Sequence, residues 1–220
     1  MEKVMDLKNN IHLKGYPEFL RFGTLIELDK NQHLQQSFRV LKDFYFVCQG
    51  KLELGFHDSL GNRHTKCYYG EGEIFGYTSI KNRLGEDIYV RAVVGQTKLI
   101  KLTEANAQLL SEKNNDFARL IEKQKSLLIS KLNRRLEILF CPNVRIRLLK
   151  FIKSLADDFG EEYDGGIHVD HHLTQSDIAS NIGSSRKSTS LLLNQLEKEG
   201  LILNAKGRIF IPKLSMLDTF

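Results

Sequence analysis

Residues 173–202 read LTQSDIASNIGSSRKSTSLLLNQLEKEGLI, a stretch with two short helical patterns separated by a glycine. In the first pattern, Thr174 and Asp177 have the spacing of a capping box, with Asp in place of the more usual Glu. Gly183 follows as a tight turn, and Ser184 or Ser185 stands where it can cap a second helix. A short helix, a glycine turn and a second apolar helix predict a helix-turn-helix.

The predicted second helix begins with hydroxyl side chains and two cations, although Ser is an indifferent helix former. In a helix-turn-helix, the first turn of this helix enters the major groove of DNA. Arg186 can reach base edges there with a forked pair of donors, and Lys187 can reach a base or a phosphate. Ser185, Ser188 and Ser190 can donate to phosphates. An ordinary solvated helix start with serine caps is the alternative, and the motif in its context favours DNA binding.

A hairpin is predicted directly after this helix. Ile202 and Leu203 form one strand, residues 204–207 a turn, and residues 208–211 the second strand. This hairpin would be the wing beside the helix-turn-helix, close to the DNA backbone. The candidate DNA-contacting residues are Thr174, Ser176, Ser185, Arg186, Lys187, Ser188, Ser190, Lys206 and Arg208.

The local distribution of charge supports a nucleic-acid partner better than the net charge of the whole chain does. The chain has 220 residues and a formal net charge of +5. From Asn143 to the end, ten basic residues balance ten acidic ones, whereas residues 174–213 carry six basic and three acidic residues. The positive charge of this part is therefore concentrated on the predicted helix-turn-helix and wing.

The first half of the chain has a β pattern. Short runs rich in β-branched and aromatic residues are TLIEL (24–28), FYFVCQG (44–50), KLELGF (51–56), HTKCYY (64–69), IYVRAVVG (88–95) and TKLIKL (97–102). Turn residues separate several of these runs, and no helical pattern lies between them. We predict an antiparallel sandwich or roll, followed by a short helix that Thr103 caps.

From about residue 115 to 141 the period becomes helical, and Pro142 ends the pattern before Asn143 caps the next helix. The candidate dimer-interface residues on this long helix are Phe117, Ile121, Leu128, Leu132 and Leu139. A surface helix packed on the sheet is the alternative, but the length and apolar content favour pairing with a second copy. The predicted domains are the β-roll at 1–112, a dimerisation helix at 113–141 and a DNA-binding domain at 142–220; the family resemblance described below implies that the roll is an effector or sensor domain.

Other function classes are poorly supported. No apolar run approaches the roughly 20 residues that span a bilayer, and the N-terminus lacks the apolar core of a signal peptide. Three scattered cysteines fit reduced thiols in the cytoplasm. His57 and His64 lack the His-x-His spacing of a metal-dependent roll enzyme. His168, Asp170, His171 and His172 are interpreted as solvated loop residues rather than metal ligands. We therefore expect no membrane contact, no metal and no catalytic residues.

The order of these parts resembles the CRP/FNR family of bacterial transcription regulators. Its anchors are YYGEGEIFG (68–76), YVRAVV (89–94) and the stretch at 173–202. The resemblance implies an α+β fold in which an antiparallel, cyclic-nucleotide-binding-like β-roll precedes a long dimerisation helix and a winged helix-turn-helix. It also implies a homodimer that binds palindromic double-stranded DNA and senses a signal through the roll, with RNA polymerase as a further partner.

The same resemblance places the base-reading side chains at Arg186, Lys187 and Ser190 or Leu191. The familiar arginine is kept as Arg186, whereas Lys187 stands where the cyclic-AMP receptor has a glutamate. Leu191 stands where that receptor has a second arginine. Two of the base-reading side chains thus differ in chemistry from those of the cyclic-AMP receptor, so we expect a different operator.

The effector site departs further from the family. Tyr77 replaces the glutamate that holds the ribose, and Glu86 and Asp87 replace the Arg-Ser pair that holds the cyclic phosphate. Carboxylates repel a phosphate, so cyclic AMP is not the expected effector. The candidate pocket residues are Phe75, Gly76, Tyr77, Glu86, Asp87 and Arg91.

The sequence leaves the cofactor or effector unknown. A small organic molecule, a partner protein, a redox event at Cys48, Cys67 or Cys141, or no signal at all are open alternatives. No N-terminal cysteine cluster for an iron–sulfur centre is present. A different function class also stays open, namely a ligand-binding or protein-interaction module whose helix-turn-helix is not functional.

Overall fold

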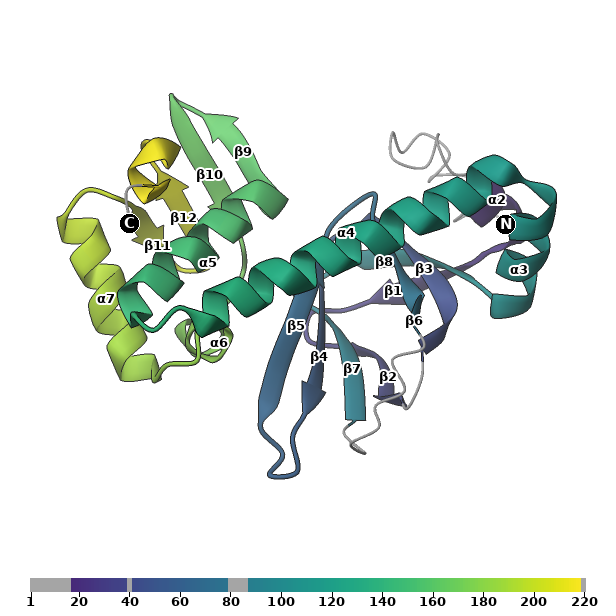
Figure 1. Cartoon of the computed structure of the whole chain (residues 1–220), viewed down its shortest axis with the longest axis horizontal. Coiled ribbons are helices and arrows are strands. Elements are labelled where there is room, and N and C mark those ends of the chain that lie inside the picture. The colour runs from purple at the N-terminus through teal and green to yellow at the C-terminus, as the bar shows by residue number, and fades with distance from the viewer. Residues whose placement is uncertain (1–16, 39–40, 79–86, 219–220) are drawn as a thin grey trace. The chain divides into compact units, whose positions relative to one another are not determined.

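The computed structural model describes residues 17–38, 41–78 and 87–218 (Figure 1). The chain divides into two compact units, Met1–Leu132 and Asn133–Phe220. The division falls inside a long helix, whereas the sequence placed a boundary at residues 141–143. The three-part organisation predicted from the sequence stays a prediction. Among the described residues, no helix is both long and apolar enough to cross a membrane.

The first unit contains two four-stranded antiparallel sheets, ordered β1-β8-β3-β6 and β2-β7-β4-β5. Their strands are β1 (Thr24–Leu28), β2 (His33–Phe38), β3 (Leu41–Gln49), β4 (Leu52–His57), β5 (Arg63–Tyr69), β6 (Ile74–Thr78), β7 (Asp87–Ala92) and β8 (Thr97–Leu102). The predicted roll is confirmed. Strands β2 and β6 were not predicted, because HLQQSF has few apolar residues and the sequence before IFGYT reads as a turn.

Strand β3 shows how the first sheet is covered on both faces. Tyr45 and Val47 belong to the core between the two sheets. Phe46 and Cys48, on the opposite face of the strand, belong to a second core. Helices α2 (Pro17–Phe22), α3 (Glu104–Lys113) and α4 (Asn115–Phe140) supply the other side of that second core. Thr103 caps α3 as predicted, and its side chain accepts from the Asn106 N–H.

The predicted long helix is α4, and its bounds match the sequence pattern closely. Two of the five residues predicted at a dimer interface, Phe117 and Ile121, are buried in the second core of their own chain. Leu128 is partly buried against the core between the sheets. The first half of α4 therefore uses its apolar stripe to cover the roll.

The second unit combines three helices with a four-stranded antiparallel sheet, ordered β11-β12-β10-β9. Its elements are α5 (Val144–Phe159), β9 (Gly160–Tyr163), β10 (Gly166–Asp170), α6 (Gln175–Asn181), α7 (Arg186–Lys198), β11 (Leu203–Ala205), β12 (Arg208–Ile211) and a 3-10 turn (Leu214–Asp218). Asn143 caps α5 as predicted. The helix-turn-helix and the wing hairpin are both present, and β9 forms a further hairpin with β10, which was not anticipated from the sequence.

Candidate nucleic-acid interface

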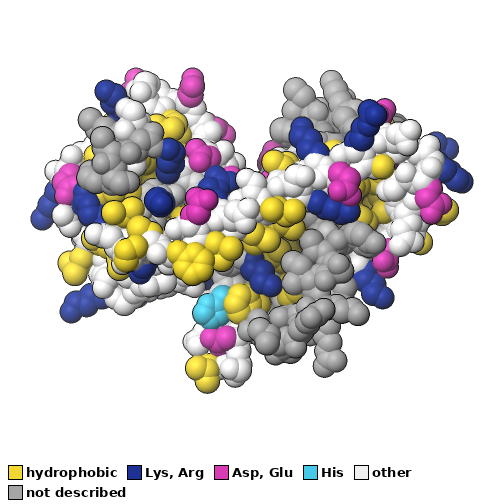
Figure 2. Space-filling view, viewed as in Figure 1, with side chains coloured by type: hydrophobic (Ala, Val, Ile, Leu, Met, Phe, Trp, Pro, Cys, Tyr) yellow, Lys and Arg dark blue, Asp and Glu magenta, His cyan; other side chains and the backbone are white. Residues whose placement is uncertain are grey.

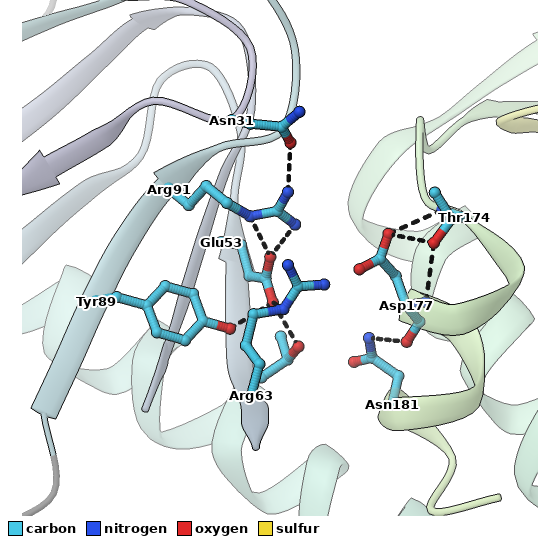
Figure 3. Close-up of polar contacts among 9 residues, drawn as sticks. Asn31, Glu53, Arg63, Tyr89, Arg91, Thr174, Asp177 and Asn181 are labelled. Carbon is cyan, nitrogen blue, oxygen red and sulfur yellow. Dashed lines mark hydrogen bonds and ion pairs between the residues drawn. The ribbon is translucent and has the colours of Figure 1, made fainter. Parts of the chain in front are cut away.

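Helix α6 begins with the predicted capping box (Figure 3). The Thr174 N–H donates to Asp177 Oδ2 at 2.9 Å, and the Asp177 N–H donates to Thr174 Oγ1 at 3.1 Å. The Asn181 amide, itself buried, donates to the Asp177 backbone oxygen at 2.8 Å. The two contacts between Thr174 and Asp177 satisfy backbone N–H groups at the start of the helix that otherwise lack partners.

The turn between α6 and α7 depends on Gly183, whose φ of +58° is a conformation that glycine adopts without strain. Arg147 on α5 fixes this turn by donating from Nε to the Ile182 oxygen at 2.7 Å and from Nη2 to the Gly183 oxygen at 3.2 Å. Arg135, from the last turns of α4, donates to the Asn181 oxygen. Sequence reasoning missed both arginines, because each reads as a surface cation on an amphipathic helix.

Helix α7 divides into a buried face and an exposed face. Thr189, Leu193 and Leu196 are completely buried, which agrees with the predicted second apolar helix. The Ser185 Oγ caps the helix by accepting from the Ser188 N–H at 3.1 Å. Ser185, Arg186, Lys187 and Ser188 are exposed at the helix start, and Ser190 is half-buried beside them.

The remaining predicted DNA contacts lie on α6 and the wing. Ser176 is exposed in the first turn of α6, and Lys206 is exposed in the turn of the β11–β12 hairpin. Arg208 is exposed at the start of β12, with its Nε 3.4 Å from Asp170 Oδ1. Asp170 therefore restrains this arginine at the base of the wing. The second unit thus presents hydroxyl groups and cations from three elements.

The first unit contains a small cavity between the roll and α4. Its volume is about 20 Å³, which is room for about one water and far below the several hundred Å³ of a typical ligand pocket. Its lining residues are Phe44, Tyr69, Ile74, Phe75, Gly76, Ile121, Gln124, Lys125 and Leu128. Two predicted pocket residues, Phe75 and Gly76, line it. Glu86 and the side chains of Tyr77 and Asp87 lie outside the described residues.

Comparison with known proteins agrees with this arrangement. Residues 146–220 match the family model of the Crp-like helix-turn-helix domain. The global nitrogen regulator of Nostoc sp. is 26% identical over 170 residues, which cover 77% of this chain and 76% of the relative. A CRP-like cAMP-activated global transcriptional regulator of Mycobacterium tuberculosis is 26% identical over 164 residues, 72% of this chain and 70% of that protein.

A solved structure of a CRP/FNR-family transcriptional regulator from Thermus thermophilus superposes with a TM-score of 0.64 at 21% identity, covering 89% of this chain and 96% of that chain. Residues 146–220 therefore belong to the Crp-like helix-turn-helix domain family, and the chain as a whole is similar to CRP-like regulators in sequence and to a CRP/FNR-family regulator in fold. Each of these three proteins is named as a regulator.

Polar contacts fasten α4 to the roll beside the cavity. The Ile74 N–H donates to Gln124 Oε1 at 3.2 Å. Lys131 Nζ donates to the Tyr68 oxygen and to Glu73 Oε2, each at 2.8 Å. Gly76 is required next to this seam, since a Cβ there would lie 1.9 Å from the Asp43 oxygen. Side chains of α4 therefore tie this helix to the roll next to the cavity.

A buried charged network was not anticipated from the sequence (Figure 3). Glu53 is only 1% exposed and lies at the centre of the network. Its Oε2 accepts from Arg91 Nε at 3.0 Å, and its Oε1 accepts from the Tyr89 hydroxyl at 2.7 Å and the Thr65 hydroxyl at 2.6 Å. Arg91 also donates from Nη1 to Asn31 Oδ1 at 2.5 Å.

The network corrects the role expected for Arg91. Leu52 and Leu54 face the core between the sheets, so Glu53 points to the opposite face of β4. Arg91 follows the same rule, because Val90 belongs to that core. Arg91 consequently pairs with Glu53 and does not line the cavity.

Opposing effects act on the Glu53 carboxyl. Burial alone raises its pKa, but the Arg91 guanidinium, the Thr65 hydroxyl and the Arg63 guanidinium together hold the pKa below its ordinary value. Arg63 Nε lies 3.7 Å from Glu53 Oε1. The carboxylate is thus kept charged by two arginines, and this arrangement is costly to disturb.

The cysteine and histidine interpretations are also revised. Burial raises the pKa of the Cys48 thiol to about 12, and Cys67 is buried too. Neither fits the exposed, low-pKa profile of a redox-sensing cysteine. His171 is buried rather than solvated, and its Nδ1 accepts from the Leu173 N–H at 2.9 Å. Within the described part of the chain, no group of three or more His, Cys, Asp or Glu residues could hold a metal.

Proposed function

We propose that this chain is a sequence-specific transcription regulator that binds palindromic double-stranded DNA as a homodimer. The observation that carries this proposal is the exposed start of α7, where Arg186 and Lys187 project from a helix whose opposite face is completely buried. Arg147 holds the preceding turn at two carbonyl oxygens. A helix that exposes an arginine, with its forked pair of donors, and a lysine, with its compact ammonium charge, suits major-groove recognition.

The proposed contacts differ in what they contribute. Arg186 and Lys187 would read base edges, which carry the sequence information. Ser188 and Ser190 on α7, and Ser176 at the start of α6, would donate to phosphates. Lys206 and Arg208 would place the wing on the backbone. Thr174 and Ser185 act first as helix caps, so their contribution to DNA binding is mainly indirect.

Operator selection from a random DNA pool, followed by affinity measurement at fixed salt, tests this function. We expect one palindromic operator, and we expect Arg186→Ala to lower its affinity by about 1–3 kcal/mol while relaxing one base pair per half-site. Arg119→Ala is the matched control, because it removes the same charge from an exposed position on α4 far along the sequence. Unselective binding by the unmodified protein would instead support a module with a non-functional helix-turn-helix.

The proposed dimer uses the second half of α4. Ile129, Leu136, Leu139 and Phe140 are exposed, with Ile129 60% exposed, and Leu132 is half-buried between them. Ile129 and Leu136 are seven residues apart, as are Leu132 and Leu139, which is the spacing of a two-helix seam. Figure 2 shows hydrophobic side chains along this half of the helix. A second copy of α4 would cover them.

Mass measurement by light scattering tests the dimer. We expect a dimer for the unmodified protein and a shift towards monomer for Ile129→Glu combined with Leu136→Glu. Leu109→Glu is the control, because Leu109 is a similarly exposed leucine on α3. Equal masses for the interface variant and the control would exclude this seam. Phe117, Ile121 and Leu128 are poor targets, since their substitution would disturb the roll.

We also propose that cyclic AMP is not the effector. The cavity is water-sized, Gln124 and Lys131 tie α4 to the roll beside it, and Arg91 is engaged by Glu53. Titration calorimetry with millimolar cyclic AMP should give no saturable heat, and the selected operator should be bound without nucleotide. Saturable binding in the micromolar range would contradict this part of the proposal while leaving DNA binding intact.

A further inference from the structure

Leu191 is the one apolar side chain on the exposed face of α7. It is 62% exposed, whereas Thr189, Leu193 and Leu196 are buried. At about 100° per residue, Leu191 lies roughly opposite this buried face, near the middle of the exposed one. Its neighbours there are exposed and polar: Lys187 four residues before it, and Asn194 and Gln195 after it.

A single exposed leucine is ordinary on a protein surface, so exposure alone assigns no role. The position of Leu191 is what matters. If α7 lies in the major groove as proposed above, the centre of its exposed face is the part that meets base edges. A leucine at that point, one turn after Lys187 on the same face, is placed to contact the bases.

The chemistry of the groove limits what Leu191 can recognise. The major-groove edges of the bases carry nitrogen and oxygen donors and acceptors, and the single apolar group among them is the C5-methyl of thymine. An apolar side chain cannot replace water at a polar base edge without leaving that edge unsatisfied. We propose that Leu191 is a specificity-determining residue that selects a thymine in each half-site by contact with its methyl group.

This inference rests on the proposed function and makes it more specific. A helix rises about 1.5 Å per residue, so Leu191 lies about 6 Å along α7 from Lys187. Base pairs are spaced about 3.4 Å apart. The selected thymine is therefore expected about two base pairs from the pair that Lys187 approaches.

The test uses the selected operator with thymine replaced by deoxyuridine, one position at a time, in one half-site. This change removes the methyl group and leaves base pairing unchanged. One position should lower the affinity of the unmodified protein about fourfold, the value expected for one buried methyl. Leu191→Ala should bind the thymine and uracil operators equally at that position. Circular dichroism should show a folded variant, because Leu191 is exposed.

Leu203→Ala is the control, because Leu203 is an exposed leucine on the wing strand and not on α7. It should keep the full thymine preference. An operator without a methyl-sensitive position, or a preference that Leu191→Ala keeps, overturns the role of Leu191 while leaving sequence-specific binding in place. Failure to select any operator overturns the proposed function itself, and with it this inference.

Discussion

Two polar clusters of this chain, drawn together in Figure 3, use hydrogen bonds in opposite ways. In the roll, charged side chains satisfy one another, because the Glu53 carboxylate accepts from Arg91, Tyr89 and Thr65. In the helix-turn-helix, polar side chains mainly satisfy the backbone: Thr174 and Asn181 bond main-chain groups, as does Arg147. In the roll, the charged groups are paired with one another inside the cluster. In the helix-turn-helix, the polar side chains hold the backbone in its conformation.

This difference distinguishes side chains that stabilise the fold from side chains that are available to contact DNA or a ligand. An arginine whose donors are occupied by a buried carboxylate has little left for a ligand, so Arg91 is structural. Capping and clamping side chains instead leave neighbouring cations exposed, as Arg186 and Lys187 are on α7. The two clusters should consequently respond very differently to substitution, and four predictions, ordered by the size of their effects, test that contrast.

The largest effect is expected in the roll. Glu53→Ala should destabilise the first unit by about 3–5 kcal/mol, because it leaves the Arg91 guanidinium buried without its counter-charge. Urea unfolding measures the change. Glu122→Ala is the control, since Glu122 is exposed and pairs with Lys125 across one helical turn. Replacing Glu53 and Arg91 together by Leu and Met should restore much of the loss, and a double variant no better than Glu53→Ala would argue against charge burial as the cause.

A smaller effect is expected at the turn of the helix-turn-helix. Arg147→Ala should cost about 1.5–3 kcal/mol in the second unit, because the oxygens of Ile182 and Gly183 lose a charged donor. Arg145→Ala, two residues earlier on α5, is the matched control. Arg145 pairs with Glu199 near the surface, where ion pairs contribute little. The helical signal on thermal unfolding compares the two, and equal losses would show that the clamp on the turn is unimportant.

The helix cap should contribute less again. Thr174→Ala removes the acceptor for the Asp177 N–H and should cost about 1 kcal/mol. Ser176→Ala, at an exposed position of the same turn, should leave stability unchanged but weaken DNA binding in a largely sequence-independent way. Stability is read from urea unfolding and affinity from titration at fixed salt. If Thr174→Ala weakened DNA binding without loss of stability, and Ser176→Ala lowered stability instead, the roles given to these two hydroxyls would be wrong.

The smallest effect is expected from mild acid. Burial, and then the Arg91 charge, lower the pKa of His33 below its ordinary value. The unfolded chain therefore takes up this proton first as the pH falls through about 6.5, and the first unit should lose a little stability between pH 7.5 and 5.5. His33→Gln should flatten this slope in unfolding experiments. An unchanged slope would assign the titration to another group.

Much of the architecture could be predicted from the sequence. The bounds of α4, the caps at Thr103, Asn143 and Thr174, and the glycine turn all agree with the structure. These features depend on residues within a few positions of one another, so helical periodicity and capping spacing reveal them. Strand β2 was missed because HLQQSF has too few apolar residues to show an alternating pattern.

The sequence by itself determined the order of roll, long helix and winged helix-turn-helix, and the residues that begin α7. Only the tertiary structure decided which polar residues pair with one another inside the protein. Glu53 and Arg91 are 38 positions apart, and their meeting depends on strand register and on which face of each strand points inward. The same holds for α4, where packing on the roll buries Phe117 and Ile121 but leaves Ile129 and Leu136 exposed. Periodicity finds the apolar positions, but only packing shows which of them the chain itself has already covered.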